Sequence, residues 1–306
     1  MSPGRVKRAG GKHPYNGRVK LAKPGDVIVG RYTVVRPLGV GSMAEVFSAR
    51  DNKRKRDVAL KIIRRNLARD PETIRRLDRE ARVQQMIRHP NVAKLYGGGI
   101  TENNEPYLVV ELLEGRSLRD VVKAERRVAP ARAAGYGWQA LQGLDAIHQV
   151  GVLHRDLKPA NLMLQPSGDA IERVVLIDFG FAALEGGGRL TAQGHVVGSL
   201  AYLPPERLMG EPGDERSDLY ALGVVLYELV TGRRPFVAAA DIDLINMHLE
   251  TPPMPPRQMA PDAGIPASIE ACILRALAKD PTERPLSAND MCAELALAGA
   301  LLPSWA

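Results

Sequence analysis

Cysteine is scarce in this sequence of 306 residues, with only Cys272 and Cys292 present. Both lie in apolar segments of helical character, so we expect no disulfide scaffold and a reducing, cytoplasmic environment. Ligands at the short spacings of a zinc site are also absent. The longest apolar runs, "LYALGVVLY" (219–227) and "LALAGALL" (295–302), are shorter than the roughly 20 residues that cross a bilayer. The sequence therefore predicts neither a transmembrane segment nor a signal peptide.

Acidic residues are missing from the first 25 positions, which carry seven basic residues. Removing those seven from the 42 basic residues leaves 35, which equals the 35 acidic residues that follow. The net charge of +7 thus belongs to residues 1–25, and we expect this segment to be a disordered tail. A solvated tail without a dedicated partner is the simpler interpretation. Electrostatic contact with nucleic acid or an anionic membrane is the alternative.

The rest of the chain has strand patterns first and helix patterns second, without an internal repeat. Residue alternation and turn signals predict strands at 31–39, 44–50, 57–63, 93–98 and 106–112, with two short ones at 161–164 and 174–178. Periodic apolar residues predict helices from Pro71 to about Ile87 and at 117–126, 131–150, 218–231, 241–249, 267–279 and 287–298. The proline-rich segment 251–259 is expected to be a connector. This order predicts an α+β fold of two lobes that join near residues 111–115, with a ligand cleft between them.

Lys61 lies inside the strand "VALKII", on the same face as Ala59 and Ile63. An ammonium among apolar residues needs a partner unless the strand is at an edge and the side chain reaches water. Glu80 shares the apolar face of the following helix, which makes it a plausible partner. Asp78 lies on another face, and Glu72 is in the first turn, where an acid favours the helix dipole.

Oxygen ligands for a hard cation occur at two places. Asp178 ends the apolar strand of "VVLIDFG" (174–180), and Asn161 ends "HRDLKPAN" (154–161). A carboxylate and an amide oxygen suit Mg²⁺, although either residue alone is also common in turns. The charged octapeptide itself is either a surface turn or a catalytic loop. The segment "LGVGSMAEV" (38–46) is either a strained hairpin or a backbone cradle for a polyanion.

These segments occur together in the order glycine loop, strand lysine, H-R-D-L-x-x-x-N, D-F-G and a variant of A-P-E. From about residue 31 to 299 the sequence therefore resembles a eukaryotic-type protein kinase, and within that family the bacterial serine/threonine kinases. The resemblance implies a bilobal fold, with a β-rich N-lobe carrying one helix (31–111) and a larger helical C-lobe (116–299). Residues 300–306 form the C-terminal end.

The resemblance implies transfer of the γ-phosphate of ATP to serine and threonine hydroxyls of protein substrates. Asp156 would orient the hydroxyl and accept its proton, and Lys158 would neutralise charge on the transferring group. Asn161 and Asp178 would hold two Mg²⁺ ions, for which Mn²⁺ is an alternative. Lys61, fixed by Glu80, would bind the α- and β-phosphates. His154 would be structural and pack near Phe179.

The implied nucleotide pocket is lined by both lobes. Val110 is the small residue at its back, Leu38, Val46 and Ala59 form its roof, and Met163 forms its floor. The backbones of Glu111 and Leu113 would bind the purine edge. The full implied set is Leu38, Gly39, Val40, Gly41, Ser42, Met43, Ala44, Glu45, Val46, Ala59, Lys61, Val110, Glu111, Leu113 and Met163.

Other implied roles belong to the helical lobe. Asp218 would anchor the backbone of the catalytic loop, and Arg284 would pair with Glu206. Three positions depart from the commonest family pattern: Ala44 replaces a glycine, Pro204 replaces an alanine, and Ser199 replaces a threonine. None of these changes removes a phosphate or metal ligand.

Regulation by autophosphorylation is implied for the activation segment 178–206. Thr191 is the favoured acceptor and Ser199 the second, with Arg155 as the cation that would bind the phosphate. Self-association is a possible route to such a reaction. An exposed Thr191 without a regulatory role is the alternative.

Two alternative functions share the fold. A pseudokinase scaffold would bind without turnover, but such proteins usually lose the strand lysine, the catalytic aspartate or the metal aspartate, and all three are present here. Small-molecule kinases of the aminoglycoside or choline type lack counterparts of Lys158 and of the Glu206–Arg284 pair. Both alternatives are therefore less favoured than a protein kinase.

Overall fold

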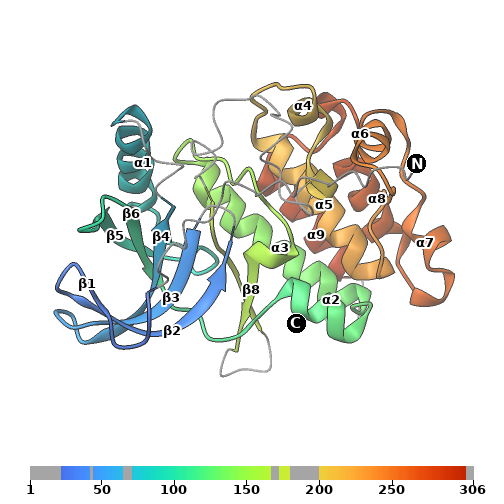
Figure 1. Cartoon of the computed structure of the whole chain (residues 1–306). Coiled ribbons are helices and arrows are strands. Elements are labelled where there is room, and N and C mark those ends of the chain that lie inside the picture. Colours follow the sequence, from blue (N-terminus) through green and yellow to red (C-terminus); the bar gives the residue numbers. More distant parts are fainter. Residues whose placement is uncertain (1–21, 42–43, 65–70, 167–171, 180–199, 301–306) are drawn as a thin grey trace, which may run out of the picture.

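The computed structural model describes residues 22–41, 44–64, 71–166, 172–179 and 200–300. Two lobes lie side by side, one built mainly of strands and one mainly of helices (Figure 1). The predicted bilobal α+β fold is confirmed. Most of the predicted basic tail and most of the predicted activation segment lie outside the described residues.

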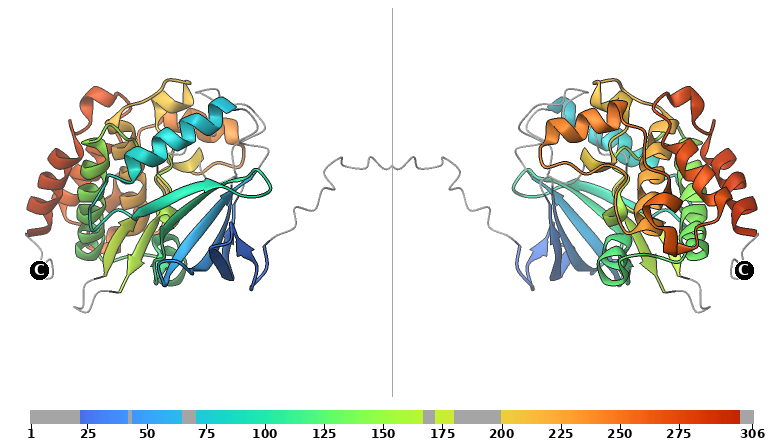
Figure 2. Two further views of the ribbon diagram at one scale, coloured as in Figure 1. Left: turned by 90° about the vertical axis from the view of Figure 1, so that its left-hand side faces the viewer. Right: turned by 90° about the vertical axis from the view of Figure 1, so that its right-hand side faces the viewer.

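The strand lobe is an antiparallel sheet of six strands in the order β1-β2-β3-β4-β6-β5. Their bounds are β1 Val27–Ile28, β2 Tyr32–Val40, β3 Ala44–Asp51, β4 Arg56–Ile63, β5 Leu95–Ile100 and β6 Pro106–Glu111. Helix α1 (Pro71–Gln84) packs on one face of the sheet through Leu77 and Ala81, which contact a cluster that includes Ala44, Ile63 and Leu108. Figure 2 shows this helix lying across the strands.

The helical lobe has its core around α3 (Pro130–His148) and α5 (Glu215–Thr231). Helix α5 is buried along almost its whole length, as its nearly continuous apolar sequence predicts. Its N-terminus has a capping box formed by Asp214 and Ser217, and it ends at Gly232. The other α-helices described are α2 Leu118–Glu125, α4 Pro205–Leu208, α6 Asp241–Glu250, α7 Pro256–Met259, α8 Ala267–Ala276 and α9 Ala288–Ala300.

A small three-stranded sheet, β7-β8-β9, belongs to the helical lobe. It consists of β7 (Arg116–Ser117), β8 (Leu162–Gln165) and β9 (Arg173–Leu176), all antiparallel. Strand β8 follows the segment "HRDLKPAN", and β9 leads into Asp178. The β8–β9 hairpin therefore connects the two segments that the sequence predicts to be catalytic or metal-binding, residues 154–161 and the segment that contains Asp178.

The proline-rich segment 251–259 differs from the prediction that it is only a connector. Pro256–Met259 forms the short helix α7, in which Pro256 is buried. A proline at the first helical position has the required φ and lacks an N–H that the helix could not pair there, so prolines start this helix rather than prevent it. The four-residue helix α4 begins with a proline in the same way.

Within the described part of the chain, every helix is too short or too polar to span a bilayer.

Candidate active site

The segment "HRDLKPAN" places a carboxylate, an ammonium and an amide in direct contact. Lys158 Nζ lies 2.8 and 2.6 Å from the two carboxylate oxygens of Asp156. Asn161 Nδ2 donates to the Asp156 backbone oxygen at 2.8 Å and to its Oδ2 at 3.0 Å. These contacts fix the Asp156 carboxylate at the lobe surface, where its side chain remains partly exposed.

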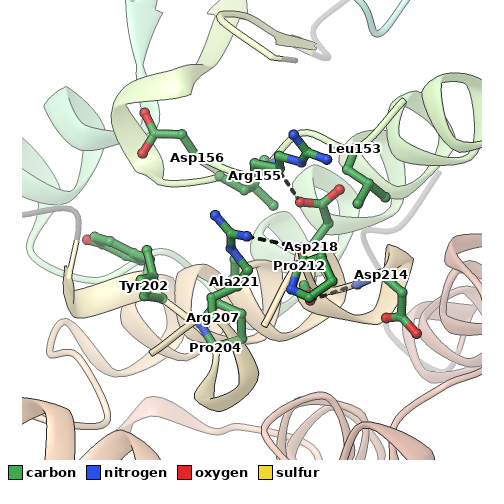
Figure 3. Close-up of a pocket in the computed structure, with 13 residues that line it drawn as sticks. Leu153, Arg155, Asp156, Tyr202, Pro204, Arg207, Pro212, Asp214, Asp218 and Ala221 are labelled. Carbon is green, nitrogen blue, oxygen red and sulfur yellow. Dashed lines mark hydrogen bonds between the residues drawn. The ribbon is translucent and has the colours of Figure 1, made fainter. Parts of the chain in front are cut away.

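Asp218 of α5 anchors the backbone of this loop through hydrogen bonds. Its carboxylate accepts hydrogen bonds from the backbone N–H groups of His154 and Arg155, both at 2.8 Å, and contacts His148 Nε2 at 2.8 Å. Figure 3 shows Asp218 beneath Arg155, and Arg155 has a φ of +66°, a left-handed conformation that costs energy for a residue with a Cβ. Burial alone would raise the pKa of Asp218, but the hydrogen bond and charge of His148 lower it overall. The predicted anchoring by Asp218 is confirmed.

Lys61 and Asp178 connect the two lobes. Lys61 Nζ on β4 lies 2.8 Å from Asp178 Oδ1, just beyond β9. Burial would raise the pKa of the Asp178 carboxyl, but the adjacent Lys61 ammonium outweighs this effect and the pKa lies below its usual value. Asp178 is therefore held as a carboxylate, the form that binds a cation.

Helix α1 places Glu80 and Gln84 toward the helical lobe. Both residues line a pocket together with Leu153 and Arg155. Gln84 Nε2 donates to the backbone oxygen of Phe179 at 2.8 Å. The proposed ion pair of Lys61 with Glu80 stays a prediction, since the Lys61 contact given above goes to Asp178. Asp78 points outward and pairs with Arg82 at 2.7 Å.

His154 is a structural residue, as predicted. It is buried, and its ring lies 6.2 Å from the Phe179 ring, measured between centroids. Burial lowers its pKa, which keeps the imidazole neutral. Neither ring nitrogen has a hydrogen-bond partner among the described residues, and the contact of the ring with Phe179 supports the predicted structural role.

Strand register gathers part of the predicted nucleotide pocket on one face of the sheet. Val46 pairs with Lys61, and Ala59 pairs with Val110. Glu45 pairs with Ile62 and lies on the opposite face, where burial raises its pKa. Ala44 is buried under α1.

The glycine loop is the tip of the β2–β3 hairpin. Gly41 N donates to Ala44 O at 2.8 Å, and Gly39 pairs with Val46. Leu38 and Val40 are exposed beside it. The predicted contact residues Ser42 and Met43 lie outside the described residues. The remaining loop can present its backbone to a ligand.

The predicted purine-binding residues Glu111 and Leu113 lie at the junction of the two lobes. Glu111 ends β6, and its N–H donates to Lys94 O at 2.8 Å. Leu113 follows in the connection to β7, and Met163 lies on β8 opposite Val175. Of the residues predicted to enclose the adenine, Met163 therefore lies in the helical lobe, and Val46 and Ala59 lie in the strand lobe.

The donor set suits a magnesium ion. Asn161 uses its Nδ2 for Asp156, so its amide oxygen is the atom available to coordinate. Asp178 supplies a carboxylate. Within the described ranges no group of three or more His, Cys, Asp or Glu residues could hold a metal by itself. Mg²⁺ typically binds one or two protein ligands together with substrate phosphates and waters, which fits this limited set.

A pocket opens beside Asp156 (Figure 3), between the catalytic loop, residues 202–204 and helix α5. Tyr202 at its edge donates from its hydroxyl to Glu228 Oε2 at 2.6 Å. No local sequence pattern indicates this contact, because the two residues are 26 positions apart and are brought together by the fold.

The predicted pair of Glu206 and Arg284 is confirmed and fully buried. Arg284 Nη1 and Nη2 lie 2.8 and 2.9 Å from the two Glu206 oxygens, and Ser217 Oγ donates to Oε1 at 2.6 Å. Burial would raise the pKa of Glu206, but these partners lower it overall. The bidentate pair fixes helix α4, which carries Glu206, to the core of the helical lobe.

Comparisons with known proteins agree with this geometry. The family model described as "protein kinase domain" matches residues 32–295. The serine/threonine-protein kinase PknB of Mycobacterium tuberculosis is 40% identical over 270 residues, which cover 87% of this chain and 42% of that protein. The kinase pkn3 of Myxococcus xanthus is 37% identical over 275 residues, covering 89% of this chain and 50% of that protein.

A solved structure is also similar. The kinase domain of PknI from Mycobacterium tuberculosis superposes with a TM-score of 0.70 at 28% identity, covering 90% of this chain and 99% of that one. The present chain spans half or less of the length of the two curated relatives named above.

Proposed function

The chain belongs to the protein kinase domain family, and from this premise we propose that it is a serine/threonine protein kinase that uses ATP and Mg²⁺. The contact that best supports this proposal is the 2.8 Å ion pair of Lys61 with Asp178, because it puts a phosphate-binding cation and a metal-binding carboxylate within one site. The residue set 154–161 lies on the helical side of the same junction.

Asp156 would receive the acceptor hydroxyl of a protein substrate at the pocket of Figure 3. The hydroxyl oxygen forms a bond to the γ-phosphorus while the bond from phosphorus to the ADP oxygen breaks, and the hydroxyl proton passes to Asp156. Lys158, at 2.6 Å from Asp156, places its positive charge beside the transferring group. The residues thus act mainly by positioning and by electrostatic stabilisation.

Lys61 would bind the α- and β-phosphates, and Val46, Ala59, Val110 and Met163 would enclose the adenine. Asp178 and Asn161 would hold Mg²⁺, which when bound would supply positive charge to neutralise the phosphate oxygens. We assign residues 31–111 and 116–299 to the two lobes of this kinase domain. Lys158 favours serine and threonine over tyrosine as acceptors, in agreement with the named relatives.

The test is phosphoryl transfer by the purified chain, supplied with magnesium, radiolabelled ATP and a generic protein acceptor. We expect label on serine and threonine. Asp156→Asn should lower the rate by at least about 100-fold, the usual magnitude for a group that acts electrostatically in the transition state. ATP binding without any transfer in the unmodified chain would instead support the pseudokinase scaffold.

We also propose autophosphorylation within residues 178–206, with Thr191 as the preferred acceptor. Its support is the exposed guanidinium of Arg155, which lies next to Asp156 and could bind a phosphate. Mass spectrometry after incubation with Mg²⁺ and ATP should find a phosphate on Thr191 in the chain, and none in Asp156→Asn. An unmodified segment in the active chain would refute this proposal.

A further inference from the structure

The loop between α1 and β5 is hydrogen-bonded to strand β9 of the other lobe. Leu176 N donates to Asn91 O at 2.8 Å, and Ala93 N donates to Leu176 O at 2.9 Å. The Asn91 side chain adds a bond from Nδ2 to Val174 O at 2.7 Å. Val92 and Leu176 form a parallel bridge. Residues 91–93 therefore extend the sheet of the helical lobe, although they belong to the connection between two elements of the strand lobe.

Gln139 of helix α3 joins this loop to β9 through one side chain. Its Oε1 accepts from Val174 N at 2.9 Å and from Asn91 Nδ2 at 3.2 Å. Its Nε2 donates to Glu172 O at 3.1 Å. The amide has both an acceptor and a donor, so a single residue can serve the loop and two positions of the β9 segment.

Gly143 lies one turn further along the same face of α3, where the loop backbone approaches the helix closely. A Cβ at this position would lie 2.8 Å from Asn91 O and 2.8 Å from Leu176 Cδ1. Such distances are too short for normal packing, so residue 143 has to be glycine for Asn91 and Leu176 to lie where they do. We refer to Gln139 and Gly143 together as the α3 seat.

Two parts of the structure connect the α3 seat to the active-site residues: strand β9, and the loop that continues helix α1. Along β9, Asp178 follows Leu176 by two positions, and Ile177 N donates to Asn161 O at 3.0 Å. Along the other path, the loop at Asn91 is the continuation of α1, whose Gln84 contacts Phe179 O. A shift of the loop or of β9 against α3 would therefore move Asp178 relative to Lys61.

We propose that Gln139 and Gly143 are positioning residues for phosphoryl transfer, because they fix the place of Asp178 and of the C-terminal end of α1 on a rigid helix. This inference rests on the proposed kinase function. Neither residue is among those assigned to contact nucleotide or metal, so both act through β9 and the loop. Small misplacements of reacting groups lower rates by up to about 100-fold, which makes an effect at this distance measurable.

The experiment compares Gln139→Leu and Gly143→Ala with Gly137→Ala as the matched control. Gly137 lies on the same helix, and the atoms nearest to its added Cβ would be side-chain atoms of Leu226 and Leu295 in the core of the helical lobe. At a temperature where all proteins are folded, we expect kcat to fall about 10-fold or more in both seat variants and to change less than about 3-fold in the control. Gln139→Glu keeps the acceptor for Val174 and Asn91 but loses the donor to Glu172 O, so it should recover only part of the rate.

Hydrogen exchange at single amides gives a readout that does not depend on activity. Gln139→Leu should speed exchange at Val174, which loses its acceptor, and Gly143→Ala should speed exchange at Leu176, because Asn91 O is displaced. Faster exchange with unchanged kcat, or rate losses equal to those of Gly137→Ala, would overturn the positioning role. An inactive unmodified chain with the predicted exchange pattern would refute the kinase function and keep the structural contact.

Discussion

Lys61 and Asp178 show, at the scale of single residues, how two groups 117 positions apart define one site. Replacing Lys61 by Met removes the ammonium while retaining much of the side-chain volume, and it leaves Asp178 without this cation. We expect the rate of phosphoryl transfer to fall by at least about 100-fold, because the phosphates lose a preorganised positive charge. Initial rates at saturating ATP and acceptor measure this.

Lys53→Met is the matched control, because Lys53 is exposed in the turn between β3 and β4. It should retain the rate of the unmodified chain within about twofold, as surface substitutions usually do. Near-normal turnover in Lys61→Met would mean that the roles of the strand lysine and of Asp178 are misassigned.

Asp51 provides a test of pH dependence in the strand lobe. Its buried carboxylate pairs with Arg31 at 2.7 Å, and the hydrogen bond from Arg31 lowers the pKa of Asp51 to about 2. A depressed folded-state pKa contributes stability that is present above the unfolded-state pKa of about 3.9 and is lost as pH falls toward 2. The difference of nearly two pKa units corresponds to about 2.5 kcal/mol at neutral pH.

We therefore expect Asp51→Asn to lower the free energy of unfolding at pH 7 by about 2.5 kcal/mol. The gap between the variant and the unmodified chain should shrink by about half at pH 3, because the unfolded chain binds the proton first. Urea unfolding at pH 7, 5 and 3 measures the gap. A gap that stays constant over this range would exclude the ion pair as its cause.

The active-site residues differ in how far sequence alone can place them. Asp156, Lys158 and Asn161 are close in sequence, and local geometry brings them into contact within one loop. Gln84 could not be assigned to the site from sequence, because nothing in the sequence shows that Phe179 O lies opposite it. Long-range contacts of this kind depend on the packing of the lobes rather than on a local pattern.

Helix α5 is the element that supports the catalytic loop, and its C-terminus depends on Gly232. This residue has a φ of +74°, and an added Cβ would lie 2.6 Å from Arg126 O. Gly264 has a similar φ of +63°, with no atom within 4 Å of an added Cβ among the described residues. The two glycines therefore separate backbone strain from steric conflict.

We expect Gly264→Ala to lower the unfolding free energy by about 1 kcal/mol. The cost arises because alanine must adopt the left-handed backbone conformation at this position, whereas its Cβ meets no steric conflict. Gly232→Ala should cost at least about 2 kcal/mol, since the Arg126 backbone must also move. Chemical denaturation compares the two. Equal losses of unfolding free energy in the two variants would show that the backbone around Arg126 moves to accept the Cβ at no energetic cost.

At the scale of elements, most long strands and helices follow from the sequence, and short ones do not. The apolar periodicity of α1, α3 and α5 and the alternation of β2, β3 and β4 predicted elements that the structure contains. Strand β1 was not predicted, because two residues carry no period. Helices α4 and α7 escaped prediction because each has only four residues, which is too short for an apolar period to be recognised.

The whole molecule consists of two lobes whose relative position decides whether the site is complete. Lys61 belongs to one lobe and Asp178 to the other, and they contact each other directly. A nucleotide that binds Lys61 brings negative phosphate toward the Asp178 carboxylate, and the two anions repel each other unless a cation lies between them. Nucleotide binding should therefore depend on magnesium through Asp178.

We expect ADP with Mg²⁺ at about 100 times its Kd to stabilise the chain by about 2.7 kcal/mol and to raise the midpoint of thermal unfolding by about 5 °C or more. ADP with EDTA should raise it much less. In Asp178→Asn the difference between the two conditions should disappear, because the variant neither repels phosphate nor holds the cation. Asp243→Asn, an exposed change on α6, should keep the full difference. If the magnesium dependence is unaltered in Asp178→Asn, the metal binds elsewhere. The contact between Lys61 and Asp178 then plays no part in nucleotide binding.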